Sequence, residues 1–354
     1  MNYPKLIIKP NIIEENVKSI VSLCSKNNIK VAGVTKGVCA NKEIVKAYIS
    51  GGVEYLADSR IENLINLKEY DIPKMMLRLP MISEVDLIVQ YANISLNSEL
   101  DTVKALSKAA LNKNIAHKII LMLDLGDLRE GIFDKKDIYK FIEEVLELPC
   151  IELIGIGTNL TCFGGLIPDT KILDQLGVIS TSIENKYNLN IDIISGGNSS
   201  TIYLLSNGNH LQINNLRLGE SLLLGKETSY GTQIKGTRDD GFLLQTEIIE
   251  IKKKPTVPIG NIGVDAFGKK PCFEDKGIRK KILCAIGKQD VKIDSLTPID
   301  SDLNILGGSS DHLIIDGDDS TKDYKVGDIL EFKLGYGGVL SAMTSNYVKK
   351  LIIE

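Results

Sequence analysis

Hydrophobic and polar positions follow a repeating pattern along the first two thirds of the chain. Short apolar runs of strand length are each followed by a stretch with apolar residues at i, i+3, i+4 and i+7, which is typical of an amphipathic helix. The apolar runs are residues 30–36, 53–58, 75–79, 94–96, 118–124, 152–158, 191–195 and 214–219. Asn41, Ser59, Ser83 and Ser98 precede helical stretches as capping residues do. The pattern predicts eight strand–helix units.

Strands that alternate with helices pair in parallel. Eight such units within about 200 residues favour a closed (β/α)8 barrel. The main alternative is an open doubly wound sheet, which is expected to carry a GxGxxG turn near its start. The sequence has no such turn. We therefore predict an α/β fold with a (β/α)8 TIM barrel over residues 10–230.

The pattern of hydrophobic and polar residues changes after residue 230. Helical periodicity fades, and the runs 241–254, 280–287, 312–317 and 328–336 read as strands between glycine and proline turns. This pattern predicts a smaller, mostly antiparallel β domain over residues 231–354. The apolar segment 3–9, which precedes the first helix, is expected to join that sheet.

Composition removes several classes of function. The formal net charge is −4, and no basic face points to nucleic acid. No apolar run reaches the ~18 residues that span a bilayer, and the first residues do not resemble a signal peptide. The six cysteines form no CxxC pair and the three histidines do not cluster, which argues against a disulfide framework and a zinc site. We expect a cytoplasmic protein with no metal and no membrane or nucleic-acid partner.

Unusual polar residues fall at the carboxyl ends of the predicted strands, where barrels carry out their chemistry. These residues are Lys36, Arg129, Asn159, Asn198, Ser199 and Arg217. Each one alone has an ordinary explanation, such as a solvated lysine, an ion-paired arginine or a turn. A cation at the end of a buried strand is nevertheless costly unless it is paired or used chemically.

The run "SGGNSS" follows the seventh predicted strand, which is where barrels often hold a phosphate group. A lysine, a phosphate cradle and two arginines at one end of a barrel suggest pyridoxal phosphate (PLP). The lysine would form a Schiff base with the cofactor aldehyde, and the cofactor would supply an electron sink.

The stretches "VAGVTKGVC", "DLGDLREG", "GIGTNLTCFGG", "ISGGNSS" and "NNLRLGES", with others along nearly the whole chain, carry a family resemblance. The chain resembles the fold-type III, PLP-dependent alanine racemase family, and in particular its alanine/ornithine racemase branch. The resemblance implies a homodimer with shared active sites that racemises an amino acid, with ornithine the first choice and lysine and alanine next.

The resemblance also implies roles for individual residues. Lys36 matches the Schiff-base lysine, and Arg217 matches the arginine that faces the pyridine nitrogen. The residues implied near the phosphate are Asn198, Ser199, Gly219, Glu220 and Tyr336, and Arg129 is implied near the cofactor and the substrate carboxylate. An arginine remains protonated and so disfavours protonation of the pyridine nitrogen, which fits racemisation better than transamination.

The chain departs from the family pattern at three places. Asn159 stands where alanine racemases have a histidine, and Ala40 stands where a tyrosine follows the Schiff-base lysine. The usual second base is a tyrosine of the partner subunit, but the matching stretch "IGVDAFG" has none. Asp265 is the candidate second base, with His312 and Cys272 as alternatives, although a turn aspartate is also an ordinary feature.

The segment "GGSSDH" at residues 307–312 is the candidate for substrate specificity. Ser309 and Ser310 are small and would leave room for a longer substrate. Asp311 could bind a distal ammonium group through a charge-assisted hydrogen bond, or it could stabilise the β domain.

Two other functions remain open at this point. A non-catalytic PLP-binding homeostasis protein would resemble the barrel alone, and the large C-terminal domain argues against it. Another PLP-dependent reaction, such as decarboxylation or aldol cleavage, is the second alternative. Decarboxylases of related barrels place an acid where Arg217 stands, and aldol cleavage would call for a metal-ligand cluster.

Overall fold

The structure, a computed structural model, describes residues 3–353. The chain divides into two units. One is Asn11–Asp239, and the other combines the described residues of Met1–Pro10 and Asp240–Glu354. The first unit therefore extends beyond residue 230. Its last segment is held by the Glu227 carboxylate, which accepts hydrogen bonds from the backbone amides of Ser229 and Thr232 at 2.8 and 2.7 Å.

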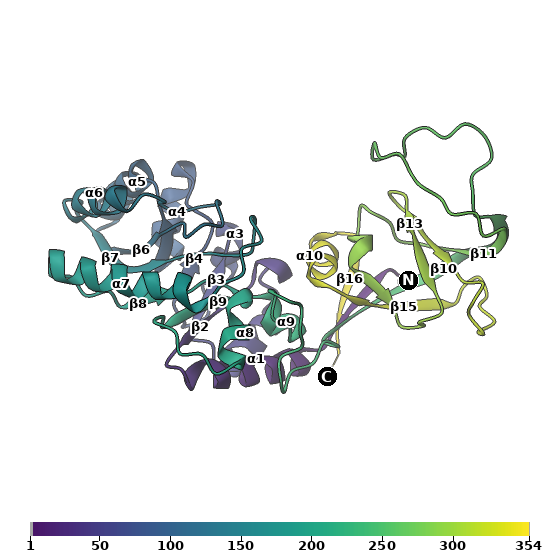
Figure 1. Ribbon diagram of the computed structural model, residues 1–354, viewed down its shortest axis with the longest axis horizontal. Helices are drawn as coiled ribbons and strands as arrows, with labels where there is room; N and C mark the ends of the chain where they lie inside the picture. Colours follow the sequence, from purple (N-terminus) through teal and green to yellow (C-terminus); the bar gives the residue numbers. More distant parts are fainter. Residues whose placement is uncertain (1–2, 354) are drawn as a thin grey trace. The chain divides into compact units, whose positions relative to one another are not determined.

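The first unit is a closed barrel of eight parallel strands that follow one another in chain order, which confirms the predicted fold class (Figure 1). The strands are β2 (Lys30–Val34), β3 (Tyr55–Asp58), β4 (Lys74–Met76), β5 (Ile94–Asn97), β6 (His117–Met122), β7 (Ile151–Gly157), β8 (Ile193–Ser195) and β9 (Asn215–Leu218). Each of the eight predicted runs contains or overlaps one of these strands. The match arises because buried parallel strands read as short, nearly continuous apolar runs.

Helices surround the strands of this unit (Figure 1). They are α1 (Pro10–Ser25), α2 (Lys42–Ser50), α3 (Ile61–Asn66), α4 (Val85–Tyr91), α5 (Leu100–Lys113), α6 (Lys135–Leu146), α7 (Thr170–Tyr187), α8 (Ile202–Ser206) and α9 (Glu220–Leu224), with short 3-10 turns η1 (Lys36–Val38), η2 (Ile82–Glu84) and η3 (Ser199–Thr201). Within the described residues, no helix is both long enough and apolar enough to cross a membrane.

Of the four predicted caps, only Asn41 acts as one. Its side chain accepts hydrogen bonds from the amides of Glu43 and Ile44 at the start of α2. Ser59, Ser83 and Ser98 do not occupy cap positions, since α3, η2 and α5 begin after Arg60, Met81 and Glu99. At α3 the carboxylate of Asp58, on the preceding strand, binds the Arg60 amide instead.

Small and apolar side chains fill the barrel interior. The core cluster consists of Ala32, Val34, Ala57, Met75, Ile94, Leu96, Ile120, Met122 and Ile193. Gly33 faces the opposite side of β2, where a Cβ atom would lie 2.6 Å from Cδ2 of Tyr48. The missing side chain therefore lets α2 pack directly against the strand that leads to Lys36.

The second unit is built on an eight-stranded, mostly antiparallel sheet. Its elements are β1 (Lys5–Ile8), β10 (Phe242–Pro255), β11 (Ile278–Cys284), β12 (Leu296–Pro298), β13 (Asn304–Gly308), β14 (Leu313–Asp316), β15 (Ile329–Leu334), β16 (Lys349–Ile352), the turn η4 (Ile293–Ser295) and helix α10 (Tyr336–Thr344). The N-terminal strand β1 pairs antiparallel with β10 and parallel with β16.

Strand β10 shows why this sheet could be recognised from sequence. Its buried residues alternate as Phe242, Leu244, Thr246 and Ile248, which is the period of a strand with one covered face. Helix α10 was not predicted. It begins at Tyr336 after Gly335 and contains two further glycines in its first turn, which are weak helix formers.

Candidate active site

The predicted barrel residues come from separate strands but gather at one end of the barrel. Lys36 begins η1 after β2, Arg129 lies in the loop after β6, Asn159 lies two residues after β7, Asn198 and Ser199 follow β8, and Arg217 lies within β9. All eight strands run in the same direction, so the loops that follow them open at the carboxyl end. This is the end where barrel chemistry is expected.

Lys36 lies at the rim of this end, and its side chain is exposed. Thr35 immediately before it is buried, and the Thr35 hydroxyl donates a hydrogen bond of 2.6 Å to Oδ2 of Asp58. These contacts fix the turn in which β2 becomes η1. The cost of burying a cation at a strand end therefore does not apply to the Lys36 amine, because Lys36 lies beyond the last strand residue and extends from the open end.

Arg217 is the buried cation of the site, with 5% of its surface exposed. Its guanidinium donates to the Thr158 carbonyl at 2.7 Å and to the Ser195 hydroxyl, which itself donates to Oδ1 of Asn215 at 2.6 Å. Burial lowers the pKa of Arg217 to about 10. The group remains protonated at neutral pH, and the two bonds use only part of its five N–H donors.

Asn198 links the turn after β8 to the turn after β7. Its Nδ2 donates to Oδ1 of Asn159 at 3.0 Å and to the Leu160 carbonyl at 2.8 Å, while its Oδ1 accepts the Ser200 amide at 2.8 Å. Gly197 before it has φ of +102°, a conformation that glycine adopts without strain. The glycine thus lets the chain turn sharply from β8 into η3.

Ser199 and Ser200 lie side by side in η3 but differ in their bonding. The Ser199 hydroxyl donates to Oγ of Ser221 at 3.0 Å and accepts the Ser221 amide at 3.2 Å. Oγ of Ser200 and Nδ2 of Asn159 are buried and have no hydrogen-bond partner among the described residues. A buried polar atom without a partner is costly in a native protein, so these two atoms are candidates for contact with a bound group.

The neighbouring residues at the β9 turn complete this region. Gly219 precedes α9 and packs so closely on β2 that a Cβ atom would lie 3.3 Å from Cβ of Val34. Glu220 begins α9, and burial raises the pKa of its carboxyl group. The turn that holds Gly219 therefore lies beside the strand that leads to Lys36.

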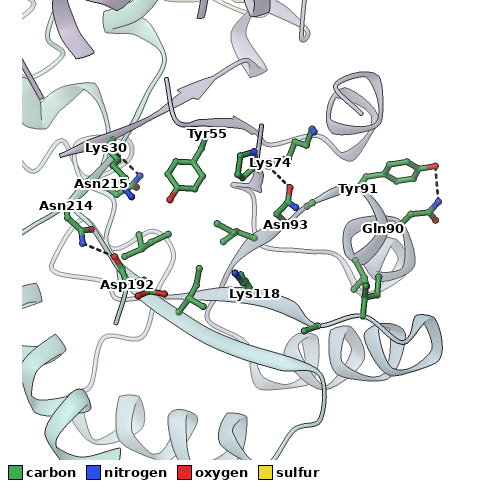
Figure 2. Close-up of a pocket in the computed structure, with 18 of the residues that line it drawn as sticks. Lys30, Tyr55, Lys74, Gln90, Tyr91, Asn93, Lys118, Asp192, Asn214 and Asn215 are labelled. Carbon is green, nitrogen blue, oxygen red and sulfur yellow. Dashed lines mark hydrogen bonds between the residues drawn. The ribbon is translucent and has the colours of Figure 1, made fainter. Parts of the chain in front are cut away.

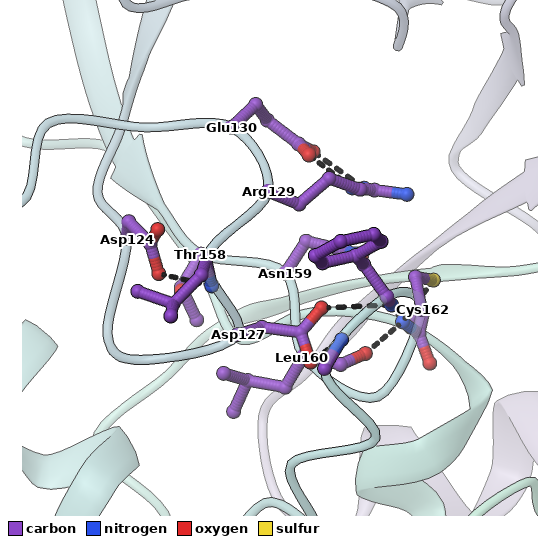
Figure 3. A network of polar contacts seen from close by, with 12 residues as sticks. Asp124, Asp127, Arg129, Glu130, Thr158, Asn159, Leu160 and Cys162 are labelled. Carbon is purple, nitrogen blue, oxygen red and sulfur yellow. Dashed lines mark hydrogen bonds and ion pairs between the residues drawn. The ribbon is translucent and has the colours of Figure 1, made fainter.

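Arg129 lies in a loop that is anchored to the loop after β7 (Figure 3). The buried carboxylate of Asp127 accepts amide hydrogen bonds from Thr161, Phe163 and Gly164 at 2.9, 3.0 and 3.1 Å. The Arg129 guanidinium forms an ion pair with its neighbour Glu130. The Arg129 side chain remains 39% exposed, so it is accessible at the carboxyl end.

The candidate second base, Asp265, belongs to the β domain and lies in the long loop between β10 and β11. Its Oδ1 accepts the amides of Phe267 and Lys269, both at 2.9 Å. The Lys269 and Phe267 amide bonds lower the pKa of Asp265 below its ordinary value. Lys288 Nζ lies 3.8 Å from the carboxylate. The group closes a turn and is held in its ionised form.

The candidate specificity segment lies between β13 and β14 of the same unit. Oδ1 of Asp311 accepts hydrogen bonds from the hydroxyls of Ser309 and Ser310 at 3.0 and 3.3 Å and lies 3.0 Å from Nδ1 of His312. The His312 contact lowers the pKa of Asp311. The Asp311 side chain is 60% exposed. It is therefore an accessible carboxylate.

Two further candidates also lie in the β domain. Tyr336 is the first residue of α10 and is half-buried, and Cys272 is an exposed free thiol in the β10–β11 loop. Within residues 3–353, no group of three or more His, Cys, Asp or Glu side chains is arranged to hold a metal ion.

Sequence reasoning missed two residues that the structure places at the site. Ser200 was passed over for Ser199, because nothing in "SGGNSS" distinguishes a hydroxyl that finds a partner from one that does not. Asp127 was read only as part of the Arg129 stretch. Its loop-anchoring bonds join residues more than 30 positions apart, and no local pattern records them.

The sequence profile of the family "Alanine racemase, N-terminal domain" matches residues 8–227, which span the barrel. The chain belongs to the alanine racemase family. The expected family resemblance is confirmed, and the match also covers Lys36, Arg129, Asn159, Asn198, Ser199 and Arg217.

Two characterised relatives are similar over their full length. An ornithine racemase of Acetoanaerobium sticklandii is 52% identical over 99% of this chain and 100% of its own. A lysine racemase of Thermotoga maritima is 38% identical over 99% of each. Among solved structures, an alanine racemase of Bartonella henselae with covalently bound pyridoxal phosphate superimposes with a TM-score of 0.74. That structure is 17% identical and covers 99% of each chain, so it supports the fold of the alanine racemase family.

Proposed function

We propose that the protein is a PLP-dependent racemase that interconverts L- and D-ornithine, with lysine and then alanine as the alternative substrates. The observation that carries this proposal is the 52% identity to an ornithine racemase over 99% of the chain. Similarity of that extent includes both the barrel and the β domain. The 38% identity to a lysine racemase supports a basic amino acid as the substrate.

The residues at the carboxyl end suit PLP. Lys36 offers an exposed amine for the aldehyde, and Arg217 offers spare N–H donors for the ring nitrogen. The buried hydroxyl of Ser200 and the buried amide nitrogen of Asn159 have no partners among the described residues. A phosphorylated aromatic aldehyde would satisfy these groups together, with Ser199 and Gly219 beside the phosphate.

When bound, PLP supplies an electron sink that makes the Cα–H bond of an amino acid acidic. The chain supplies the proton transfers and the orientation. Lys36 Nζ holds or moves the proton at Cα on one face. Arg217 carries a pKa of about 10, so it presents an N–H donor to the pyridine nitrogen and disfavours its protonation. Arg129 binds the substrate carboxylate, and its ion pair with Glu130 is then partly broken.

Racemisation needs a second group on the opposite face of Cα. We propose Asp265 for this role, with His312 and Cys272 as the alternatives. The lowered pKa of Asp265 makes its carboxylate a weak base. To accept the Cα proton, the carboxylate must therefore release the Phe267 and Lys269 amides, which hold its pKa low. Direct replacement of Asp265 tests the assignment.

We also infer a cytoplasmic homodimer in which Tyr336 and Asp311 of the β domain contribute to the active sites, Tyr336 near the phosphate and Asp311 at the distal ammonium of the substrate. The absence of disulfides among the six cysteines agrees with a reducing compartment. Sedimentation of the PLP-loaded protein should give twice the mass of the 38.9 kDa chain. A monomer with full activity would contradict the shared site.

The decisive assay is incubation with L-ornithine in heavy water. Optical rotation should decay to zero while deuterium enters Cα, because each turnover exchanges that proton. Incorporation without any loss of optical activity indicates a one-sided reaction. Retained protium across ornithine, lysine and alanine favours a non-catalytic PLP-binding protein, and a changed carbon skeleton favours another PLP reaction.

A further inference from the structure

A large cavity lies at the amino end of the barrel, opposite the end that carries Lys36 (Figure 2). Its volume is about 1010 Å³, and the beginnings of the barrel strands form its walls. Lys30 opens β2, Tyr55 opens β3 and Lys74 opens β4. Tyr55 and Ile154 also pack against the apolar core cluster. That cluster separates this cavity from the candidate active site.

The charge of the cavity is unusual for this chain. Four lysines line it, Lys30, Lys68, Lys74 and Lys118, against the single carboxylate of Asp192. The whole chain has a net charge of −4, and many of its other lysines form ion pairs with acidic side chains. Lys30, Lys68 and Lys118 are exposed and Lys74 is half-buried, so together they give this opening an excess of positive charge.

These ammonium groups are not neutralised from within the chain. Lys30, Lys68 and Lys118 make no side-chain hydrogen bond or ion pair with any residue in the described range 3–353. Lys74 Nζ donates to the Tyr70 carbonyl at 2.5 Å, which carries no formal charge. The negative charge of Asp71 lies close enough to Lys74 to favour the protonated form of its amine. The Asp192 carboxylate already accepts a hydrogen bond from the side-chain amide of Asn190.

The cavity also offers a neutral donor. The Tyr55 hydroxyl has no hydrogen-bond partner among the described residues, although its ring packs on the barrel core. Figure 2 shows Tyr55 and Lys118 among the residues that line this opening, together with Lys30 and Lys74. A phosphate or carboxylate group accepts both kinds of donor.

We propose that this cavity binds a small polyanion, a molecule that carries two or more phosphate or carboxylate groups. Such a ligand would relieve the repulsion between the lysines and satisfy the free Tyr55 hydroxyl. The volume is in the range of cavities that hold small molecules. The lysines and Tyr55 of this cavity are not among the candidate active-site residues, so the inference does not rest on the proposed racemase activity. Asn215 lines the cavity and also accepts a hydrogen bond from Ser195, which binds Arg217.

The test is calorimetric titration of the full chain, carried out with and without PLP and ornithine, because binding at the amino end should be the same in both states. Pyrophosphate and citrate are the probes, and the difference between them distinguishes phosphate from carboxylate ligands. Each is expected to bind with one site per chain, and Lys30→Ala/Lys118→Ala should weaken binding at least about tenfold. Tyr55→Phe should weaken it about threefold.

The matched control is Lys108→Ala/Lys140→Ala, which removes the same charge from exposed positions on α5 and α6. This control should change the affinity for pyrophosphate and citrate by less than about twofold relative to the unmodified protein, since these lysines lie outside the cavity. Melting temperatures without anion verify that both double variants fold. The proposal is overturned if neither probe binds at concentrations on the order of 5 mM. It is equally overturned if the cavity variant and the control bind alike.

Discussion

Replacement of Ser200 distinguishes a cofactor role from a structural role, because the two roles predict opposite changes in the free energy of unfolding of the cofactor-free protein. Its hydroxyl is fully buried and has no partner among the described residues. A buried, unsatisfied polar group costs about 1–3 kcal/mol. In the cofactor-free protein, Ser200→Ala should therefore raise the free energy of unfolding by about 1 kcal/mol. If Ser200 binds the cofactor as proposed, the same change in the loaded protein removes a hydrogen bond to an anionic group.

A hydrogen bond to a charged group contributes about 1.5–3 kcal/mol, so the Kd for PLP should rise roughly 10- to 150-fold. Guanidinium unfolding of the apoprotein and absorbance titration with PLP measure the two quantities. Thr246→Val is the matched control, since the Thr246 hydroxyl is also buried and unpartnered but lies in β10 of the β domain. It should stabilise the protein without changing PLP affinity.

Ser199→Ala supplies the contrast. The Ser199 hydroxyl already exchanges two hydrogen bonds with Ser221, so its loss should destabilise the apoprotein by about 1 kcal/mol. If Ser200→Ala also destabilises the apoprotein and leaves PLP affinity unchanged, the unpartnered hydroxyl does not serve the cofactor and the reasoning fails.

Three further predictions concern the second base, the substrate and pH. Asp265→Asn should lower kcat for both directions of ornithine racemisation by about 100-fold or more, and unchanged kinetics would clear Asp265 of the role. Asp311→Asn should raise KM for ornithine about tenfold and leave alanine unaffected, whereas equal effects on both would indicate a structural role. Burial lowers the pKa of His117 to about 4 from an ordinary value of 6.5, so the unfolded chain takes up the proton first and stability falls as pH drops between those values. The loss from pH 7.5 to 5 should be about 2 kcal/mol, and His117→Asn should flatten that part of a urea-unfolding pH profile.

The barrel strands could be predicted because burial on both faces leaves an apolar run at every strand, and polar helical stretches separate the runs. The β domain was harder. Long β10 has a clear alternation, but β12 has three residues and depends on pairing with β15, which lies more than 30 positions away. Helix α10 was missed because its glycines hide the helical pattern, and tertiary packing stabilises it instead.

The candidate site was predictable as a set of strand ends, since closure of the barrel brings those ends together whatever the loops do. The state of each side chain was not. The exposure of Lys36 depends on where β2 stops, and the free hydroxyl of Ser200 depends on Ser221 bonding to its neighbour. The lysines of the amino-end cavity were not singled out from the sequence, because no single strand shows how many cations the closed barrel brings to one space.

The account depends most on covalent attachment of PLP to Lys36, and borohydride reduction followed by peptide mass spectrometry tests it directly. We predict loss of the visible absorbance band and a pyridoxyl group on the peptide that contains Lys36, in full yield and absent from Lys36→Ala. A label on a different lysine, or no label on a protein that still racemises ornithine, would contradict the central claim.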